Sequence, residues 1–117
     1  MRLYQILNEG SINDIQKMIS SGNAADWIRE GDMEVYVRVS NRNIKGQSIP
    51  AIDLSNIISP ENSRGKGIFT RFLDNVEELA FKNGMVVYVE NIINERLKNF
   101  LINRGYTPTG KSAFKIF

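Results

Sequence analysis

The sequence of 117 residues contains no cysteine and no histidine. Without cysteine the chain has no disulfide, no thiol nucleophile and no thiolate metal ligand. Without histidine it lacks the commonest metal ligand and cannot form a Ser–His or Cys–His catalytic pair. We therefore expect no metal site, and any general base must be Asp, Glu, Tyr, Lys or a bound water.

Long hydrophobic runs and a strong charge imbalance are also missing. No apolar run approaches the ~20 residues that a helix needs to cross a bilayer. Residues 1–9 lack the long apolar stretch of a signal peptide. These absences predict a cytoplasmic protein without a membrane partner. The formal net charge of +2 is compatible with an anionic ligand but does not favour nucleic acid.

The composition is that of a single globular domain, 1–117. Hydrophobic residues make up 42% of the chain and charged residues 24%, which are ordinary values for one compact core. In the first half we expect a strand at 2–7, a short helix at 11–21, and a loop or helical turn at 23–32. Trp27 and Ile28 are expected to fill the core.

A change of period marks the next segment. Hydrophobic residues alternate with polar ones over 33–39, which predicts a strand with one buried face. Turn formers follow at 41–46, and a second apolar stretch covers 49–58. The sequence therefore predicts a β-hairpin over 33–58.

The second half alternates helices and strands. Hydrophobic residues at helical spacing predict a helix over 68–82, and a continuous apolar run predicts a central strand at 85–89. A second helix begins after Asn94 as its N-cap and ends at Gly105. A short strand is expected at 113–117.

The segment Arg64-Gly65-Lys66-Gly67-Ile68 lies between a predicted strand and the clearest predicted helix. Two glycines let the backbone approach a ligand closely, and free N–H groups at a helix N-terminus favour an anion. An isolated G-x-G is more often only a tight turn. The position before a helix instead predicts a cradle for a pyrophosphate.

These residues resemble the acetyl-CoA loop of the GNAT acetyltransferase superfamily, which reads Arg/Gln-x-x-Gly-x-Gly/Ala. A second block, 89–106, is similar to the family's strand, Asn-capped helix and Gly-aromatic ending. The resemblance covers roughly residues 52–109 and implies that the strand before the loop diverges from its neighbour. It assigns acetyl-CoA, through backbone or side-chain contacts, to Ile57, Ile58, Arg64, Gly65, Lys66, Gly67, Ile68, Phe69 and Asn94.

Three features depart from the family pattern. Phe69 replaces the last small residue of the loop motif, and Leu101 stands where many family members carry a tyrosine that protonates the leaving thiolate. The chain is also short for the family, so that the hairpin at 33–58 replaces a longer meander. These departures leave open a member that has lost catalysis.

Candidates for the general base come from strand ends. Glu90 follows the central strand and is our candidate, and Asp53 on the preceding strand is an alternative. Such carboxylates are more often solvated or paired than catalytic. Tyr88 and Tyr106 are alternative proton donors, although a structural role is expected for each.

A further motif, 105–112, matches the phosphate-binding pattern G-x-x-x-x-G-K-[ST]. That loop requires a strand before it and a helix after it. Here a helix precedes the motif and Pro108 interrupts it, so we reject a nucleotide site at this position.

The predicted fold class is α/β, or α+β in stricter usage. It consists of a twisted, mixed and mainly antiparallel sheet flanked by helices, with strands splayed at the acetyl-CoA site. The resemblance implies acetyl transfer to a primary amine, on a small molecule or a protein, by direct attack in a ternary complex. The alternative is a catalytically impaired GNAT-fold protein that acts through a partner. A nucleic-acid partner is not expected, and a homodimer is compatible with the sequence.

Overall fold

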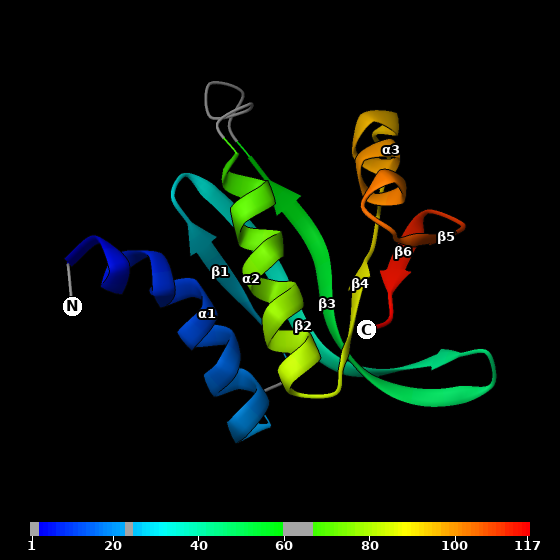
Figure 1. The fold of residues 1–117 in the computed structure, drawn as a ribbon, viewed down its shortest axis with the longest axis horizontal. Helices are drawn as coiled ribbons and strands as arrows, with labels where there is room; N and C mark the ends of the chain where they lie inside the picture. The colour runs from blue at the N-terminus through cyan, green and yellow to red at the C-terminus, as the bar shows by residue number, and fades with distance from the viewer. Residues whose placement is uncertain (1–2, 23–24, 60–66) are drawn as a thin grey trace.

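The protein is α+β, with one six-stranded sheet and three helices in the described chain (Figure 1). The computed structural model describes residues 3–22, 25–59 and 67–117, and for residues 3–10 the backbone alone. Its elements are α1 (Leu3–Ser21), β1 (Ala25–Glu30), β2 (Met33–Ile44), β3 (Gln47–Ile58), α2 (Ile68–Lys82), β4 (Val86–Val89), α3 (Glu95–Asn103), β5 (Thr107–Thr109) and β6 (Ser112–Lys115).

The strands follow the order β1-β2-β3-β4-β6-β5. Neighbours in the described sheet pair antiparallel except β3 and β4, which pair in parallel over 51–54 and 86–89. A parallel pair requires a crossover, which α2 provides. The predicted mixed, mainly antiparallel sheet and the central position of β4 are confirmed.

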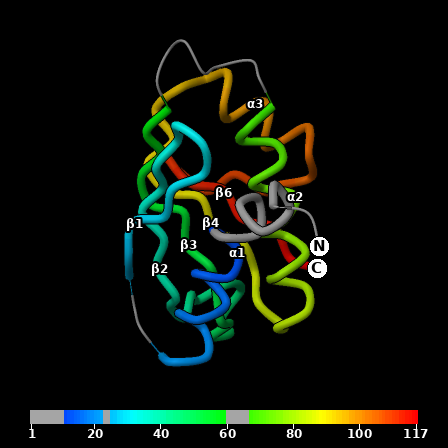
Figure 2. Tube along the Cα trace, turned by 90° about the vertical axis from the view of Figure 1, so that its left-hand side faces the viewer, coloured from blue at the N-terminus to red at the C-terminus, as the bar shows by residue number. Residues whose placement is uncertain are grey.

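The helices lie on one face of this sheet (Figure 2). All three contribute buried side chains to the main hydrophobic cluster, for example Ile15 from α1, Phe72 from α2 and Leu101 from α3. On β2 the core side chains are Met33, Val35 and Val37, as their alternation predicts. We call the opposite side of the sheet, which no described helix covers, the open face.

The first helix corrects the prediction for the N-terminal region. Residues 3–21 form one helix, so the strand predicted at 2–7 is wrong. A run of six residues is too short for periodicity to separate a strand from a helix, and this run continues into a clear helical pattern. Inside α1, Ser11 is buried, and its hydroxyl donates to Glu30 Oε2 at 2.9 Å, which fixes the helix against β1.

The second correction concerns 23–32, predicted as a loop or helical turn. Residues 25–30 instead form β1, joined to β2 by two residues that include Gly31 at φ +59°. Ile28 is buried as expected, but Trp27 is 46% exposed and contacts Tyr36 with ring centroids 5.3 Å apart. With β1, the hairpin becomes a three-stranded meander, so the first half is less reduced than the sequence indicates.

The predicted hairpin of β2 and β3 is confirmed, but its strands are longer than expected. Ile44 pairs with Gln47, and only Lys45 and Gly46 form the turn, both with positive φ. Such a turn matches the twist of the two strands. The tip reaches beyond the rest of the sheet, on the side away from α1 (Figure 1).

The second half follows the prediction closely, with α2, β4 and α3 in the expected places. The terminal strand occupies 112–115 instead of 113–117 and pairs with a short strand, 107–109, that was not predicted. This hairpin contains Pro108 and most of the G-x-x-x-x-G-K-[ST] match. The structure thus confirms that the match lacks the helix a nucleotide loop needs.

Candidate functional site

The parallel pair of β3 and β4 opens at one end. Pairing stops at Leu54 and Val89, while β3 continues to Ile58 along β2. Figure 1 shows the two strands separating towards the end of the molecule that carries α3 and the start of α2. The splayed strands expected from the sequence are therefore present.

A β-bulge in β3 lies at the root of this opening. Tyr36 pairs with Asn56 and Val37 with Leu54, so Ser55 is an extra residue on β3. A bulge increases local twist and bends a strand. It therefore directs the end of β3 away from β4.

Two contacts close the opening on its inner side. The Glu90 N–H donates to the Leu54 carbonyl at 2.9 Å, and Asn91 Nδ2 donates to the Ser55 carbonyl at 2.9 Å. In the described part of the chain, β3 makes no further backbone hydrogen bond towards β4. The backbone around Ile57 and Ile58 thus presents a strand edge, which is what an extended ligand needs to pair as an added strand.

The N-terminus of α2 lies just beyond the end of β3. Gly67 precedes it with φ +73°, and an added Cβ there would meet only Arg71 Nη1, at 3.7 Å. Within the described residues no side chain caps this helix. Its first N–H groups, from Ile68 and Phe69 onward, have no partner inside the helix. An anion is favoured at such an end.

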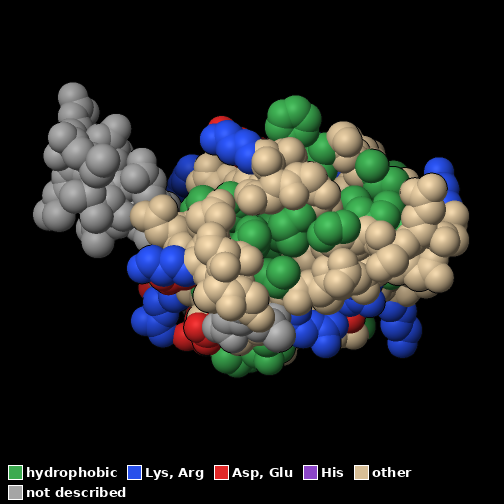
Figure 3. All heavy atoms as spheres, turned by 90° about the horizontal axis from the view of Figure 1, so that it is seen from below, with side chains coloured by type: hydrophobic (Ala, Val, Ile, Leu, Met, Phe, Trp, Pro, Cys, Tyr) green, Lys and Arg blue, Asp and Glu red, His purple; other side chains and the backbone are tan. Residues whose placement is uncertain are grey.

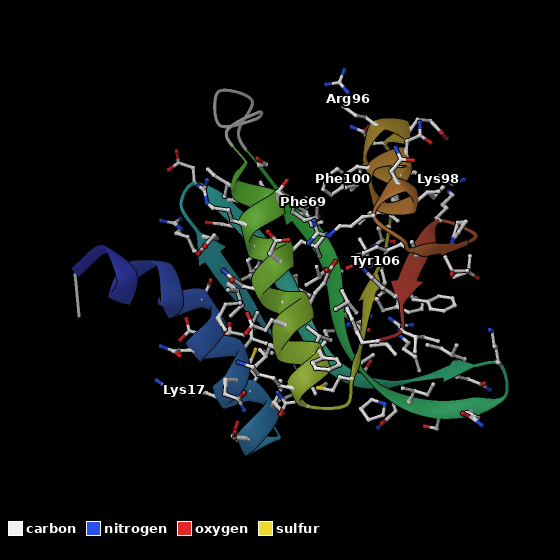
Figure 4. The ribbon with its side chains drawn as sticks, viewed as in Figure 1. Lys17, Phe69, Arg96, Lys98, Phe100 and Tyr106 are labelled. Atoms are coloured by element: carbon white, nitrogen blue, oxygen red, sulfur yellow. The ribbon has the colours of Figure 1, made fainter. Side chains whose placement is uncertain are left out.

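The other predicted loop residues, Arg64, Gly65 and Lys66, lie outside the described residues. The structure does place Phe69, which replaces the small residue of the family motif. Its side chain is partly buried against the core, and its ring contacts Phe100 of α3 with centroids 6.0 Å apart (Figure 4). Phe69 therefore bridges the two helices.

Asn94 caps α3 as predicted. Its side-chain oxygen accepts from the backbone N–H of Arg96 at 2.8 Å and of Leu97 at 3.4 Å. The cap uses only the oxygen, so the amide nitrogen keeps its two donors. Contact with a cofactor stays a prediction.

The residue at the position where the resemblance implies a general acid is fully buried. Leu101 has 0% exposure and belongs to the main core cluster. Tyr106 is also buried, and its hydroxyl donates to Glu77 Oε2 at 2.8 Å. Burial, followed by the charge of Glu77 and this hydrogen bond, raises the pKa of Tyr106 above its ordinary value. Tyr106 is therefore poorly suited to donate a proton to a substrate.

Glu90 is held by two arginines and a serine. Arg38 Nη2 and Ser55 Oγ donate to its Oε1, the latter at 3.0 Å, and Arg42 Nη2 lies 2.5 Å from the same oxygen. Burial alone would raise the pKa of Glu90, but the hydrogen bonds from Arg38 and Ser55 and the charges of both arginines lower it below its ordinary value. A carboxylate with a lowered pKa is a weaker base.

Asp53, the alternative base, is fully buried. Ser40 Oγ donates to its Oδ2 at 2.6 Å, and Arg42 Nε donates to its Oδ1 at 3.1 Å. These contacts leave it paired inside the protein. The alternation over 33–39 places Arg38 on the polar face of the predicted strand, whereas Arg42 falls in the predicted turn at 41–46 and lies on β2 in the structure. Neither prediction identifies the partners of these arginines.

No metal or membrane feature is found in what the structure describes. Among these residues no group of three or more Asp and Glu side chains is placed to hold a metal ion. None of the helices in the described segments is long and apolar enough to cross a membrane.

Comparisons with solved structures identify proteins of the same fold. A mutant of the AtaT toxin, bound to the C-terminus of the antitoxin AtaR and acetyl-CoA, aligns with TM-score 0.55 and 17% identity over 72% of this chain and 57% of that one. The KacTA–DNA complex aligns with TM-score 0.62 and 16% identity over 89% and 79%. AtaT with acetyl-methionyl-tRNAfMet aligns with TM-score 0.56 and 15% identity over 72% and 61%.

The chain therefore spans less than two thirds of the AtaT chain. No family model and no curated protein matches the sequence. Two of these neighbours contain nucleic acid, so they do not support the expectation that nucleic acid is not a partner. The likeness to these proteins, together with the splayed strands β3 and β4, shows that the chain has the GNAT-type α+β fold.

Proposed function

We propose that this protein is an acetyl-CoA-dependent N-acyltransferase that moves an acetyl group to a primary amine. The observation that carries the proposal is the parallel pair of β3 and β4, which opens beyond Leu54 and Val89 beside the N-terminus of α2, a helix end that no side chain of the described residues caps. A neighbour of the same fold has been solved with acetyl-CoA, which supports this assignment.

The residues present fit acetyl-CoA. The free edge of β3 at Ile57 and Ile58 would pair with the pantetheine arm, and the first amides of α2, at Ile68 and Phe69, would bind the pyrophosphate. The open space at Gly67 allows a close approach. When bound, acetyl-CoA supplies the acetyl thioester that the amine attacks directly.

Glu90 remains our candidate for handling the proton of the amine. It follows β4 at the root of the opening, where its N–H forms the last backbone hydrogen bond to β3. Because its pKa is lowered, we propose that Glu90 orients the protonated amine and passes its proton to water. A positioned carboxylate contributes in this way without having a pKa near neutrality.

The acceptor is a primary amine on a small molecule or a protein. The complex of AtaT with acetyl-methionyl-tRNAfMet adds an amine carried by tRNA as a candidate. Arg96 and Lys98 on α3 favour this candidate, since Arg96 is exposed and points away from the molecule (Figure 4) and Lys98 is half-buried beside it. Basic side chains on one exposed helix suit contact with phosphates.

The test is calorimetric titration of acetyl-CoA into the wild type, Gly67→Glu and Gly46→Glu. Both glycines have positive φ, at +73° and +83°, so the two variants carry comparable backbone strain. Only Gly67→Glu places a negative charge at the N-terminus of α2. We expect micromolar binding by the wild type and Gly46→Glu, and at least tenfold weaker binding by Gly67→Glu. No binding by the wild type would overturn the proposal.

A catalytically impaired binding protein is the second candidate. It is favoured by Leu101, which is fully buried where family members carry the acid, and by the ion pairs that occupy Glu90. The two candidates differ in turnover. Release of free CoA with a panel of amines identifies the enzyme, whereas binding of acetyl-CoA without any release identifies the binding protein.

A further inference from the structure

A row of side chains crosses the open face of the sheet. Arg38 of β2 pairs with Asp53 of β3, Asp53 pairs with Tyr88 of β4, and Tyr88 pairs with Phe114 of β6. Directly paired residues project to the same side of a sheet. Because Val37 and Leu54, their neighbours along the strands, belong to the core under the helices, this row lies on the open face.

Four charged side chains meet at this row. Arg38, Arg42, Asp53 and Glu90 form what we call the four-charge cluster. Arg42 Nε donates to Asp53 Oδ1 at 3.1 Å, and Arg42 and Arg38 both contact Glu90 Oε1. The Arg42 guanidinium also lies over the ring of Tyr88, 4.2 Å from its centroid. The formal charges sum to zero.

Arg38 and Arg42 each have an N–H group that lacks an aligned hydrogen-bond acceptor among the described residues. A guanidinium carries five N–H groups in a fixed plane. Arg38 Nε and Arg42 Nη2 are buried and have no aligned hydrogen-bond acceptor in the described structure, although Arg42 Nη2 is close enough to Glu90 for an ion pair. Buried donors of this kind are rare unless something else satisfies them. Arg38 Nε lies 3.8 Å from Asp53 Oδ2, so both nitrogens are paired by charge but lack an aligned hydrogen bond, which a ligand oxyanion would supply.

A depression of about 300 Å³ lies at the same place, which is enough space for a small molecule. It is lined by Arg38, Val39, Ser40, Asn41, Arg42 and Asp53. Seen from below, hydrophobic side chains occupy the middle of the molecule, and charged side chains of both signs lie mainly around its border (Figure 3). The lining of the depression offers the guanidinium groups of Arg38 and Arg42 to an anion and the Asp53 carboxylate to a cation. Glu90, which is not part of the lining, contacts both arginines.

The four-charge cluster adjoins the opening between β3 and β4. The backbone N–H of Glu90 makes the last backbone–backbone hydrogen bond across the described pair, and the Glu90 side chain belongs to the cluster. A ligand on the open face would meet the opening from the side opposite α2. The two sides of the opening can thus serve different substrates.

We infer that the four-charge cluster recognises an acceptor that carries an oxyanion close to its amine. This inference rests on the proposed acetyl transfer and specifies its acceptor. Arg38 and Arg42 bind the oxyanion, a carboxylate or a phosphate, and Glu90 receives the ammonium group. A purely cationic polyamine would face two guanidinium groups, and a purely anionic ligand would face two carboxylates. A ligand with both charges leaves the cluster balanced.

The test follows the arginine Nε–Hε signals of the ¹⁵N-labelled wild type by NMR. Glycine is the carboxylate probe, phosphoethanolamine the phosphate probe and putrescine the cationic control. We expect saturable shifts of Arg38 and Arg42 with glycine or phosphoethanolamine, and the probe that acts identifies the oxyanion. Exposed Arg29, paired with Glu34, is the internal control and should not shift. The inference is overturned if neither zwitterion shifts the two arginines, if Arg29 shifts equally, or if putrescine acts as well as they do.

This titration contains no acetyl-CoA, so its failure is distinct from failure of the calorimetric test. A kinetic readout uses Arg38→Lys with Arg29→Lys as the matched control. With the effective acceptor, we expect Arg38→Lys to raise KM about tenfold and to change kcat less than about twofold, because Lys cannot reproduce the bidentate contact. A loss of kcat at unchanged KM would overturn recognition as the role. Circular dichroism verifies that each variant folds.

Discussion

At Glu90, burial and ion pairing act on the pKa in opposite directions. Burial is the largest single influence and would raise the pKa. The hydrogen bonds from Arg38 and Ser55 and the charges of the two arginines together outweigh burial, so the pKa is lowered. An ion pair of an exposed carboxylate on the surface contributes little to protein stability. Glu90 is largely shielded, with 19% of its side chain exposed, so its pairing contributes to stability.

The pH dependence of stability follows from this shift. A pKa that is lower in the folded than in the unfolded state stabilises the protein above the unfolded value, here near 4.5, and this stability is lost as pH falls through the folded pKa. We expect Glu90→Gln to lower the free energy of unfolding by about 1–2 kcal/mol at pH 7. Urea unfolding at pH 7 and pH 3 measures the difference. An equal difference at both pH values would contradict the assignment.

Leu101 is structural at the position where the resemblance to the GNAT family implies a catalytic tyrosine. It is fully buried, whereas its neighbour Ile102 is 40% exposed. We expect Leu101→Ala to lower the free energy of unfolding by about 2–5 kcal/mol, and Ile102→Ala by less than about 1 kcal/mol. Chemical denaturation compares the two. Similar values for both variants would show that α3 is not held by Leu101.

At the scale of elements, Asn94 caps α3, and two substitutions distinguish this role from a contact with acetyl-CoA. Asn94→Ala removes the oxygen that accepts from Arg96 and Leu97, and we expect it to lower the free energy of unfolding by about 1 kcal/mol. Asn94→Asp keeps a capping oxygen but loses the amide donors. If Asn94 contacts acetyl-CoA as proposed, both variants bind it more weakly in calorimetry. Wild-type affinity in Asn94→Asp would leave Asn94 as a cap only.

The strand β3 is a second element whose role depends on its neighbours. Its bulge at Ser55 arises because Glu34–Ile44 of β2 lies opposite the longer segment Gln47–Ile58 of β3, in which Ser55 has no partner. Hydrophobic periodicity is read along one strand, so it cannot reveal a mismatch between two. The sequence therefore predicts the strand but not the bend that opens it from β4.

For the whole molecule, Glu77 joins three elements. Arg104, after α3, donates to both of its oxygens, at 2.7 and 3.1 Å, and Tyr106 donates to Oε2. Lys115 of β6 lies 3.7 Å from Glu77 Oε1 and donates to the Arg104 carbonyl at 3.0 Å. Glu77 itself is on α2. This network sets how α3 and the C-terminal hairpin sit against α2.

Removing members of this network tests its contribution. Tyr106→Phe deletes one hydrogen bond and leaves Glu77 paired, so we expect the free energy of unfolding to fall by about 1 kcal/mol. Glu77→Ala leaves Tyr106 without its acceptor and Arg104 with Asp74 alone, and we expect a loss of about 3 kcal/mol. Thermal and urea unfolding measure both. A larger effect of Tyr106→Phe than of Glu77→Ala would contradict this hierarchy.

Much of the fold could be predicted from the sequence because long periodic segments carry strong signals. The helix over 68–82 and the hairpin over 33–58 are clear examples. The strand predicted at 2–7 is wrong because so short a run does not distinguish a strand from a helix. The strand β1 lies where a loop or helical turn is predicted, although Gly31 and Asp32 between two runs are a hairpin signal. The residues at which a helix or strand begins and ends depend on the segments it packs against, and hydrophobic periodicity carries no information about those segments.

By itself the sequence determined that thiol and imidazole chemistry is absent, since the chain has no cysteine or histidine. It also determined that a glycine, Gly67, precedes the predicted helix over 68–82. Local effects such as the Asn94 cap follow from neighbouring residues and were read correctly. Only the tertiary structure decided the four-charge cluster, because Arg38 and Glu90 are 52 residues apart and meet through the register of three strands. Register is a property of pairing, and the energy that sets it comes from the buried face of the sheet rather than from the charged face.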